Sequence, residues 1–444
     1  MSGIVIVGGG VAGLSCAWQL QRAGHDVEVL ELSDAIGGRV QSQECGEFIL
    51  EAGVQHLHGS DGNLRGVAAE LGIGSAIRSL DAGRGGGSDA ILRGARFEAC
   101  DVEGLRRLLS SGDVSVRGKL GLAALSLELL RRRQALEPSR PERAAALDGE
   151  GAPSTLARIA GEQVRDSVLA PILAARLGCD PERMSGAFAL LVLQSLLRGS
   201  RPQWLEGGLA RLPRALAQGI PVRTGCEVLS VETHTEGVRV RYCISGREGS
   251  AVADAAVMAV PGTRAAALCS KLTPAESAFF AGVDYAPGAS LHLLLEHPPR
   301  ALPPGAYAVG FPRRAGVMLH ALYQAHLRPG ATPPGAGLLV AQLADAAAEH
   351  CLQAPDAEVV DSALERLART PLGRLTPVRA VVTRRAEWLP RFSRGYLARL
   401  AGFARRLERS PRLAFAGDYL VGPSLEGAVT SGLRAASQVV ADCR

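Results

Sequence analysis

The chain contains 444 residues, of which 47% are hydrophobic and 21% charged, and its formal net charge at pH 7 is +5. This length exceeds what one compact core usually holds, so two domains are expected. Aromatic residues make up only 4%, and no basic stripe is interleaved with them, which argues against nucleic-acid binding.

Nine cysteines are scattered along the chain, and none form a C-x-x-C pair. This spacing fits neither a zinc site nor a disulfide framework, so we expect no metal and a reduced, cytoplasmic setting. No apolar run reaches the roughly 20 residues that a bilayer span needs. A peripheral membrane contact is the alternative, because residues 119–133 form an apolar stretch that ends in three arginines.

The first thirty-one residues carry a nucleotide-binding pattern. Ile4–Val7 predicts a strand, Leu14–Ala23 a helix, and Val27–Leu30 a second strand that ends at Glu31. The turn between the first strand and the helix has the form G-x-G-x-x-G and consists of Gly8, Gly9, Gly10, Val11, Ala12 and Gly13. Strand, glycine turn, helix, strand and acid follow in the order that dinucleotide binding requires.

The chemistry of this pattern indicates the ligand. The first glycine makes the tight turn, the second lets a pyrophosphate approach the backbone, and the third lets the helix pack on the strand. The helix N-terminus offers free N–H groups and partial positive charge to the phosphates. Glu31 is placed to accept a hydrogen bond from a ribose hydroxyl, and its charge disfavours a 2′-phosphate. The pattern therefore predicts FAD or NAD rather than NADP.

Beyond this unit the pattern changes twice. Helical periodicity dominates between residues 81 and 201, while strands are more frequent after residue 225. The expected helices are residues 119–136, 156–177, 186–197, 357–369 and 424–440, and residues 137–153 form an exposed connection rich in Pro, Gly and charge. The expected strands are residues 226–232, 238–243, 256–260, 290–296, 306–311, 317–323, 338–343, 378–384 and 413–416.

These elements predict an α/β fold with two interleaved domains. A Rossmann-like dinucleotide-binding domain would contain residues 1–80, 202–284 and 386–444. An α+β substrate domain, made of an antiparallel sheet plus helices, would contain residues 81–201 and 285–385.

Four blocks resemble the flavin-containing amine oxidase superfamily, which includes protoporphyrinogen oxidases and phytoene-type desaturases. They are Val5–Glu31, Gly37–Arg39, Gly46–Gly53 and Phe415–Ala428. The resemblance covers essentially the whole chain. It implies that the Rossmann-like domain is an FAD-binding domain and that FAD is the cofactor.

The resemblance also implies roles for residues in the second and third blocks. Gly37 and Gly38 would let the chain pass close to the FAD diphosphate, which Arg39 would neutralise. Gly53 would lie against the isoalloxazine. Three residues would follow on the face of the flavin, namely Val54, Gln55 and His56.

Further contacts are implied near the C-terminus and in one central strand. The backbone of Val228 would contact the adenine, and Trp388 would lie near the dimethylbenzene side of the flavin. After Gly417, Asp418 would hold ribityl or diphosphate oxygens. The turn that contains Gly427 and Ala428 would open a helix whose N-terminus points at the flavin pyrimidine edge, although a helix merely capped by Ser424 is an alternative.

The chain departs from the amine oxidase pattern at three places. The stretch Tyr285–His292 lacks the lysine that amine oxidases place near flavin N5. Ser424 stands where a tyrosine would form one side of an aromatic pair around the amine. No cysteine lies near Phe392–Tyr396, so the FAD is expected to be non-covalent. These departures favour the porphyrinogen-oxidase or desaturase side of the superfamily.

The implied reaction removes hydride from a C–H of a mostly apolar small molecule and passes the electrons to oxygen or another acceptor. His56 is the candidate general base, and Trp388 is a second candidate catalytic residue. One alternative is an FAD-dependent amine oxidase with an atypical active site. Another class is a protein that retains FAD for a structural or non-redox purpose. No motif specifies an oligomeric state.

Overall fold

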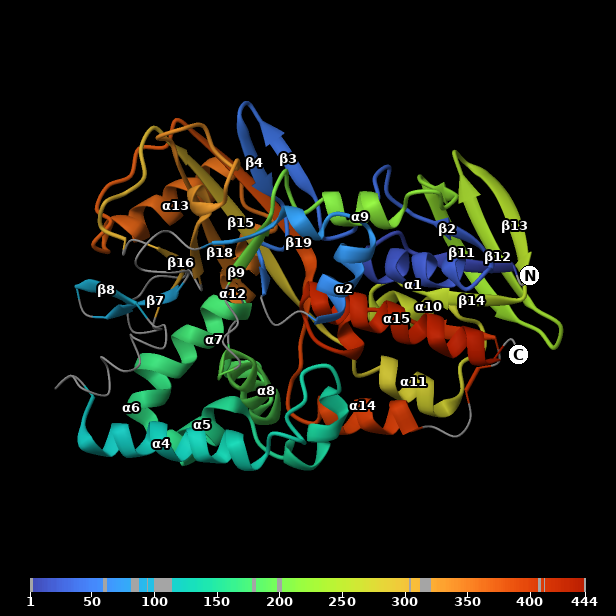
Figure 1. The fold of residues 1–444 in the computed structure, drawn as a ribbon, viewed down its shortest axis with the longest axis horizontal. Coiled ribbons are helices and arrows are strands. Elements are labelled where there is room, and N and C mark those ends of the chain that lie inside the picture. The colour runs from blue at the N-terminus through green and yellow to red at the C-terminus, as the bar shows by residue number, and fades with distance from the viewer. Residues whose placement is uncertain are drawn as a thin grey trace.

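The computed structural model describes residues 3–58, 62–80, 88–93, 95–99, 114–177, 181–197, 202–302, 305–311, 321–405, 409–410 and 412–442. A nucleotide-type parallel sheet and a large mixed sheet lie at opposite ends of the molecule, and a block of helices lies beneath the large sheet in the view of Figure 1. This arrangement confirms the predicted α/β fold with two interleaved parts.

The parallel sheet is built from segments far apart in the sequence. Its strand order is β10-β2-β1-β14-β20, and all neighbouring strands are parallel. The strands are β1 (Gly3–Val7), β2 (Asp26–Leu30), β10 (Val222–Arg223), β14 (Ala255–Met258) and β20 (Leu413–Phe415). Since the four residues Ile4 to Val7 and all of β14 are buried, both faces of the sheet are covered, as is usual for a parallel sheet.

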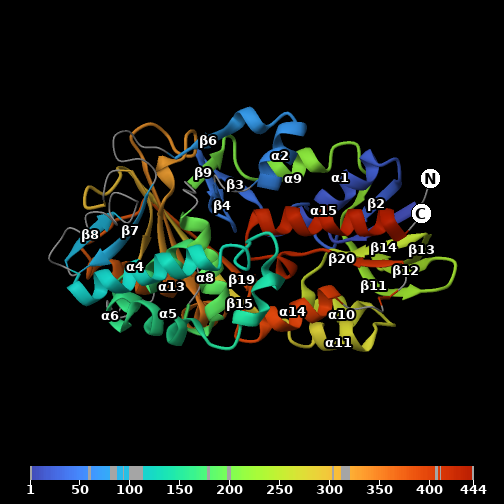
Figure 2. The same cartoon turned by 60° about the horizontal axis from the view of Figure 1, so that its bottom comes forward.

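Helix α1 (Val11–Arg22) follows β1 and packs against the last helix, α15 (Leu425–Asp442). The two helices run side by side in Figures 1 and 2. Their contact is close, because a Cβ added to Gly432 would lie only 2.3 Å from the carbonyl oxygen of Ala12. The first and last helices of the fold therefore depend on each other.

Smaller elements surround the parallel sheet. An antiparallel sheet contains β11 (Cys226–Thr233), β12 (Val238–Ile244) and β13 (Arg247–Ala253), and a hairpin contains β3 (Ser42–Cys45) and β4 (Phe48–Glu51). A third small sheet has the order β5-β9-β6, with β5 Leu57–His58, β9 Pro202–Leu205 and β6 Ile77–Ser79. The helices here are α2 (Gly62–Glu70), α9 (Arg211–Leu216), α10 (Gly262–Leu268), α11 (Pro274–Phe280) and α14 (Tyr396–Arg405), with short 3-10 turns at Gly74–Ala76 and Asp418–Leu420.

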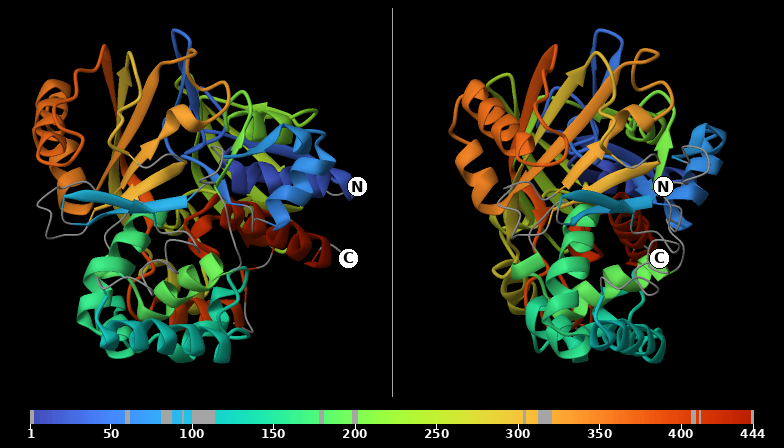
Figure 3. Two further views of the ribbon diagram at one scale, coloured as in Figure 1. Left: turned by 60° about the vertical axis from the view of Figure 1, so that its left-hand side comes forward. Right: turned by 90° about the vertical axis from the view of Figure 1, so that its left-hand side faces the viewer.

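The large sheet has seven strands in the order β19-β15-β18-β17-β16-β7-β8. They are β15 (Tyr285–Leu295), β16 (Ala306–Gly310), β17 (Ala321–Gln324), β18 (Gly337–Ala344), β19 (Arg379–Pro390), β7 (Ser88–Arg93) and β8 (Arg96–Ala99). Neighbouring strands are antiparallel except β16 and β7. Helices α12 (Asp345–Cys351) and α13 (Asp356–Ala368) pack against one face of this sheet, as Figure 3 shows, and a 3-10 turn, Ala325–Leu327, follows β17.

The helical block differs from the expectation at several places. The helix expected at 119–136 is α4 (Val116–Arg131), and the connection at 137–153 contains a 3-10 helix, Pro141–Leu147. The helix expected at 156–177 is broken, because α5 (Ala152–Ala160) ends at Gly161, whose φ of +86° cannot continue a helix. The chain continues as α6 (Glu162–Val164), a π-helical segment Arg165–Leu169 and α7 (Ala170–Leu177); the 3-10 turn Pro181–Arg183 then precedes α8 (Gly186–Leu197).

The strands also differ from the expectation in one region. Residues 81–201 were expected to be mainly helical, yet β7 and β8 extend the large sheet. Of the strand expected at 317–323, only residues 321–323 lie among the described residues. The proposed domain boundary at residue 386 falls inside β19, so this strand would belong to both domains.

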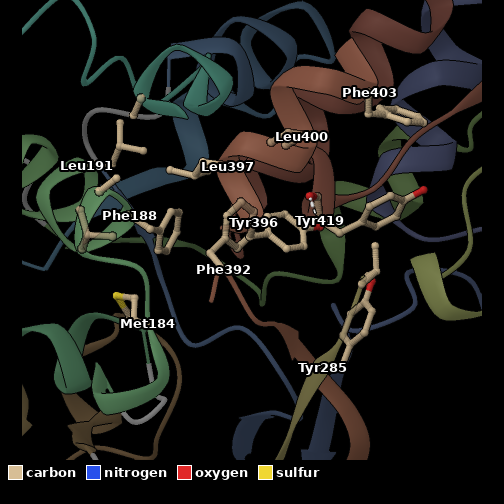
Figure 4. Packing of buried hydrophobic residues seen from close by; sticks show 14 of the residues in the cluster. Met184, Phe188, Leu191, Tyr285, Phe392, Tyr396, Leu397, Leu400, Phe403 and Tyr419 are labelled. Carbon is tan, nitrogen blue, oxygen red and sulfur yellow. Dashed lines mark hydrogen bonds between the residues drawn. The ribbon is translucent and has the colours of Figure 1, made fainter. Parts of the chain in front are cut away.

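A chain of aromatic side chains connects the helical block to the nucleotide-binding part (Figure 4). Phe188 of α8 stacks on Phe392 with ring centroids 4.3 Å apart, and Phe392 contacts Tyr396 at 4.7 Å. The hydroxyl of Tyr396 donates to the carbonyl oxygen of Tyr419 over 2.8 Å. The two parts of the molecule thus share one apolar core, which fixes their relative position.

Candidate functional site

A cavity of about 890 Å³ lies where the parallel sheet meets the large sheet. Residues of all four sequence blocks line it, together with residues of β11, β19 and α7. The predicted site residues on its wall are Gly8, Gly10, Val11, Ala12, Glu31, Gly37, Gly38, Arg39, Gly53, Val54, Gln55, His56, Val228, Trp388, Gly417, Asp418 and Ala428. Residues separated by more than 400 positions in the chain therefore meet at one site.

Two predicted cofactor residues, Gly13 and Gly427, are not on the cavity wall. At each of them an added Cβ would lie 2.1 Å from a backbone oxygen, that of Gly8 and of Gly422 respectively. Both glycines therefore allow the close packing of a turn against the start of a helix, which supports the wall from behind.

Glu31 is held by the glycine turn and by the residues that follow it. Its Oε2 accepts from the N–H of Gly9 over 2.6 Å, and its Oε1 accepts from the N–H of Ser33 over 2.8 Å. The side chain is buried but borders the cavity. Since each carboxylate oxygen has a second lone pair, Glu31 can still accept from a ligand hydroxyl.

The second block lies beside the glycine turn. The N–H of Gly37 donates to the carbonyl oxygen of Gly9 over 2.8 Å, and a Cβ on Gly38 would lie 3.3 Å from the Cα of Gly10. Gly53 approaches the same segment so closely that an added Cβ would lie 1.9 Å from the carbonyl oxygen of Arg39. Only glycine fits at residue 53 with this backbone.

Arg39 connects the second block with the fourth. Its Nη2 donates to Oδ1 of Asp418 over 2.7 Å, and its Nη1 donates to the carbonyl oxygen of Trp388 over 2.9 Å. The pKa of Arg39 is raised: burial alone would lower it, but the ion pair with Asp418 more than compensates. Arg39 is therefore a fixed positive charge on the cavity wall.

The N-terminus of α15 borders the cavity through Leu425 and Ala428. The Oγ of Ser424 accepts from the N–H of Gly427 over 3.0 Å, so Ser424 caps this helix as one alternative proposed. The cap does not exclude a ligand, because other N–H groups of the first turn have no partner within the helix.

Trp388, on β19, packs against β15. A Cβ added to Gly288 would lie 2.3 Å from Cγ of the indole, so glycine at this position lets the indole lie directly on the neighbouring strand. Trp388 is buried and borders the cavity, as its predicted place beside the flavin requires.

His56 lies at a further part of the wall, among other rings. Its ring contacts those of His58, Tyr307 and Tyr323 with centroids 4.6, 5.1 and 5.8 Å apart. Burial, together with the charges of Arg176 and Arg328, lowers the pKa of His56 to about 3. His56 is therefore neutral at pH 7 and a weak base.

Buried polar side chains lie near the segment that carries His56. Glu51 accepts from the hydroxyl of Ser42 over 2.8 Å and from the N–H of Leu209 over 3.0 Å, while burial raises its pKa to about 7. Arg328 is almost fully buried, with its guanidinium 4.8 Å from the centre of the Trp204 ring. Arg328 and Tyr307 position the segment that carries Gln55 and His56, since both donate to the carbonyl oxygen of Gln55, over 3.5 and 2.8 Å.

Several lining residues were missed by sequence reasoning: Arg176 on α7, Tyr285 on β15, Tyr323 on β17, Gln342 on β18 and Arg385 on β19. They belong to no motif, and only the packing of the large sheet and α7 brings them to the cavity. Neither lysine is among the lining residues: Lys119 is on α4, and Lys271 follows α10.

The described residues contain neither a metal-ligand cluster nor a membrane-spanning helix. No group of three or more His, Cys, Asp or Glu could hold a metal ion in this part of the chain. Within the same residues, no helix has the length and apolar character needed to cross a membrane.

Comparison with known proteins places the site in context. A family model described as flavin containing amine oxidoreductase matches residues 11–440. A probable flavin-containing monoamine oxidase A of Dictyostelium discoideum is 39% identical over 72 residues, which are 16% of this chain and 16% of that protein. The chain therefore aligns with only about a sixth of the length of this curated relative.

Two solved structures match over nearly the whole chain. A triple mutant of putrescine oxidase has a TM-score of 0.80 and 20% identity and covers 99% of each chain. A candidate protoporphyrinogen oxidase from Exiguobacterium sp. 255-15 has a TM-score of 0.76 and 18% identity, covering 99% of this chain and 98% of the other. At such identities the likeness demonstrates a common fold.

Proposed function

Because the chain belongs to the flavin containing amine oxidoreductase family, we propose that it is an FAD-dependent oxidoreductase acting on a mostly apolar small molecule. The reaction removes hydride from a C–H of the substrate, and oxygen or another acceptor takes the electrons. One observation carries the proposal. A single cavity is lined by residues of all four sequence blocks and by side chains of α7 and the large sheet.

The residues on the wall fit FAD chemically. Glu31 offers an acceptor for a ribose hydroxyl, and the glycine turn leaves room for a diphosphate to approach the backbone. Arg39 supplies positive charge, and the start of α15 supplies N–H groups with partial positive charge. When bound, FAD supplies the hydride acceptor, and the protein supplies orientation and electrostatics.

We propose that this binding is non-covalent. No cysteine occurs between Trp388 and Phe403. Cys226 borders the cavity, but burial raises the pKa of its thiol, which disfavours the reactive thiolate.

The substrate end of the cavity supports a substrate that is not a simple amine. Leu177, Tyr323, Trp388 and Pro423 contribute apolar or aromatic surface to the cavity, and Arg176 also lines it. A small protonated amine would gain little from this apolar lining, whereas a large apolar molecule would gain roughly 25 cal/mol per Å² of surface removed from water. A porphyrinogen, polyene or polycyclic molecule fits this description.

A neutral histidine limits the range of mechanisms. His56 can donate or accept a hydrogen bond to orient the substrate, but with a pKa of about 3 it takes a proton poorly. Hydride loss from an electron-rich carbon needs no strong base. His56 and Trp388 are therefore proposed as groups that orient the reacting C–H.

The amine oxidase alternative remains worth testing, since the structural neighbour with a TM-score of 0.80 is a putrescine oxidase. The test is steady-state peroxide release with benzylamine, a polyamine and a porphyrinogen, together with anaerobic titration of the flavin absorbance. We expect a porphyrinogen or polyene to bleach the flavin and both amines to be poor. If either amine is turned over efficiently and the apolar compounds are inert, the protein is an amine oxidase and the proposed substrate class is wrong.

The third alternative, FAD retained for a non-redox purpose, has its own outcome. In that case the protein would be yellow, yet no compound in the panel would reduce the flavin. A protein that is colourless and cannot be reconstituted with FAD would overturn the whole proposal. Acid precipitation of the yellow protein should release all of the flavin into the supernatant.

A further inference from the structure

Arg385 is a cation on the cavity wall that belongs to none of the four sequence blocks. It lies on β19, opposite Gly288 of β15, and is partly buried. Its Nη2 donates to the carbonyl oxygen of Gly38 over 3.3 Å. Its Nε is buried and makes no hydrogen bond in the described part of the chain.

Among the described residues, no carboxylate forms an ion pair with this guanidinium. The charged group that acts on it most is a second cation, Arg39, which together with burial lowers the pKa of Arg385. The nearby acid, Asp418, is already in the ion pair with Arg39. A second acid on the cavity wall, Glu387, acts on Arg39 and accepts from the hydroxyl of Thr263. The electrostatic environment of Arg385 is therefore dominated by another cation.

Two neighbouring guanidinium groups repel each other unless an anion binds between or beside them. A buried charge is unfavourable without a partner, and a buried N–H without an acceptor loses the hydrogen bonds that water would make. The guanidinium is a planar fork whose donors match the oxygens of a phosphate. The geometry at Arg385 is thus suited to an oxyanion entering from the cavity.

The position of Arg385 indicates which oxyanion. Its hydrogen-bond acceptor belongs to Gly38, and Gly38 lies beside Gly10, with 3.3 Å between an added Cβ and the Cα of Gly10. In the glycine pattern, the second glycine is the point where a pyrophosphate comes closest to the backbone. Arg385 is therefore on the diphosphate side of the cavity.

We propose that Arg385 is a second cationic ligand of the FAD diphosphate, acting opposite the glycine turn and beside Arg39. This inference rests on the proposed function, because it takes FAD as the occupant of the cavity. It adds a residue of the large sheet to the nucleotide site, so that β19 would contact both the diphosphate and, through Trp388, the flavin.

The test measures equilibrium binding, with no need for turnover. The whole chain, stripped of flavin, is titrated with FAD, ADP and adenosine, and the dissociation constants are compared for the wild type, Arg385→Gln and Arg385→Lys. We expect Arg385→Gln to raise the dissociation constants of FAD and ADP at least tenfold and to leave that of adenosine unchanged. Arg385→Lys should recover part of the affinity, because it keeps the charge without the fork.

The matched control is Arg379→Gln, since Arg379 is an exposed arginine on the same strand. Its dissociation constants should equal those of the wild type, and circular dichroism should report the same fold for all variants. If Arg385→Gln binds FAD and ADP within twofold of the wild type, the proposal is overturned. A variant that weakens FAD but not ADP also overturns it, because the guanidinium would then face the flavin or another group.

Failure of the proposed function would look different. A wild-type chain that binds neither FAD nor ADP would overturn the FAD reading itself, and this inference with it. A wild-type chain that binds both, alongside an Arg385→Gln variant that binds equally well, would overturn this inference alone.

Discussion

Arg39 and Asp418 form an ion pair of 2.7 Å although 379 positions separate them in the chain. Asp418 is nearly buried and Arg39 is 29% exposed at its side chain, so water screens the pair only partly. The pair ties the segment after β2 to the turn after β20. It therefore joins two segments of the cavity wall that are far apart in the chain.

Replacement Asp418→Asn should destabilise the flavin-free protein. Removing the carboxylate leaves Arg39 without its charged partner, and the loss should be about 2 kcal/mol, the range for hydrogen bonds to charged groups. Urea unfolding measures the difference. Glu365→Gln is the control: it breaks the exposed Arg369–Glu365 pair and should change the free energy of unfolding by less than about 1 kcal/mol. Equal effects of the two replacements would contradict the expectation.

The carboxyl of Glu51 should make stability fall as pH rises. Burial raises its pKa from 4.5 to about 7, so the folded state binds the proton more tightly than the unfolded state. Its contribution is fully present below pH 4.5 and is lost as the pH rises through 7. The free energy of unfolding should fall by on the order of 3 kcal/mol, because each pH unit between the two pKa values contributes about 1.36 kcal/mol.

The measurement for Glu51 is the difference in free energy of unfolding between wild type and Glu51→Gln at a series of pH values. The difference cancels the opposite effect of buried histidines such as His292, whose pKa is lowered to about 4. Relative to the wild type, the variant should gain stability between pH 4.5 and 7.5. A difference that stays constant over this range would argue against the raised pKa.

His56 should not titrate in the working range of the enzyme. Because its pKa is lowered to about 3, its neutral form persists at every pH above about 4. His56→Gln should therefore change kcat/KM by a factor that is the same from pH 5 to pH 9. The test compares the two pH profiles with one substrate. A ratio that changes tenfold around pH 6.5 would mean that His56 exchanges a proton during turnover.

Gly288→Ala should displace the indole of Trp388, because the added Cβ would lie 2.3 Å from its Cγ. We expect a loss of about 1–3 kcal/mol in stability from overpacking and a change in the near-ultraviolet circular dichroism of tryptophan. Gly66→Ala is the control, since no atom lies within 4 Å of its added Cβ, and within helix α2 alanine should stabilise by up to about 1 kcal/mol. Unchanged stability and dichroism in Gly288→Ala would refute the predicted displacement.

The nucleotide-binding unit could be predicted because its signals are local. The glycine turn, the two strands around it and Glu31 lie within thirty-one residues, and each has a backbone reason for its residue type. The strands of the large sheet were also visible as apolar runs. β7 and β8 were not, since the sequence before them is rich in glycine and shows no clear apolar alternation.

The substrate end of the cavity could not be predicted in the same way. Arg176 comes from a helix whose sequence shows only apolar periodicity, and Arg385 comes from one side of a long strand. Their function follows from which face packs inward, and that is decided by tertiary contacts. The break of the long expected helix at Gly161 was missed for a similar reason. An isolated glycine in a helical pattern does not reveal whether its φ will be positive.

The close contact of Gly432 in α15 with Ala12 in α1 has a consequence for the time at which the cofactor can enter. The glycine turn leaves the ribosome early, but the helix that packs behind it is among the last parts of the chain to be synthesised. We expect nascent chains halted before residue 413 to be flavin-free and sensitive to protease, even when their glycine turn is intact. Cofactor loading would then be a post-translational event, and the amount of yellow protein in a cell would report completed chains.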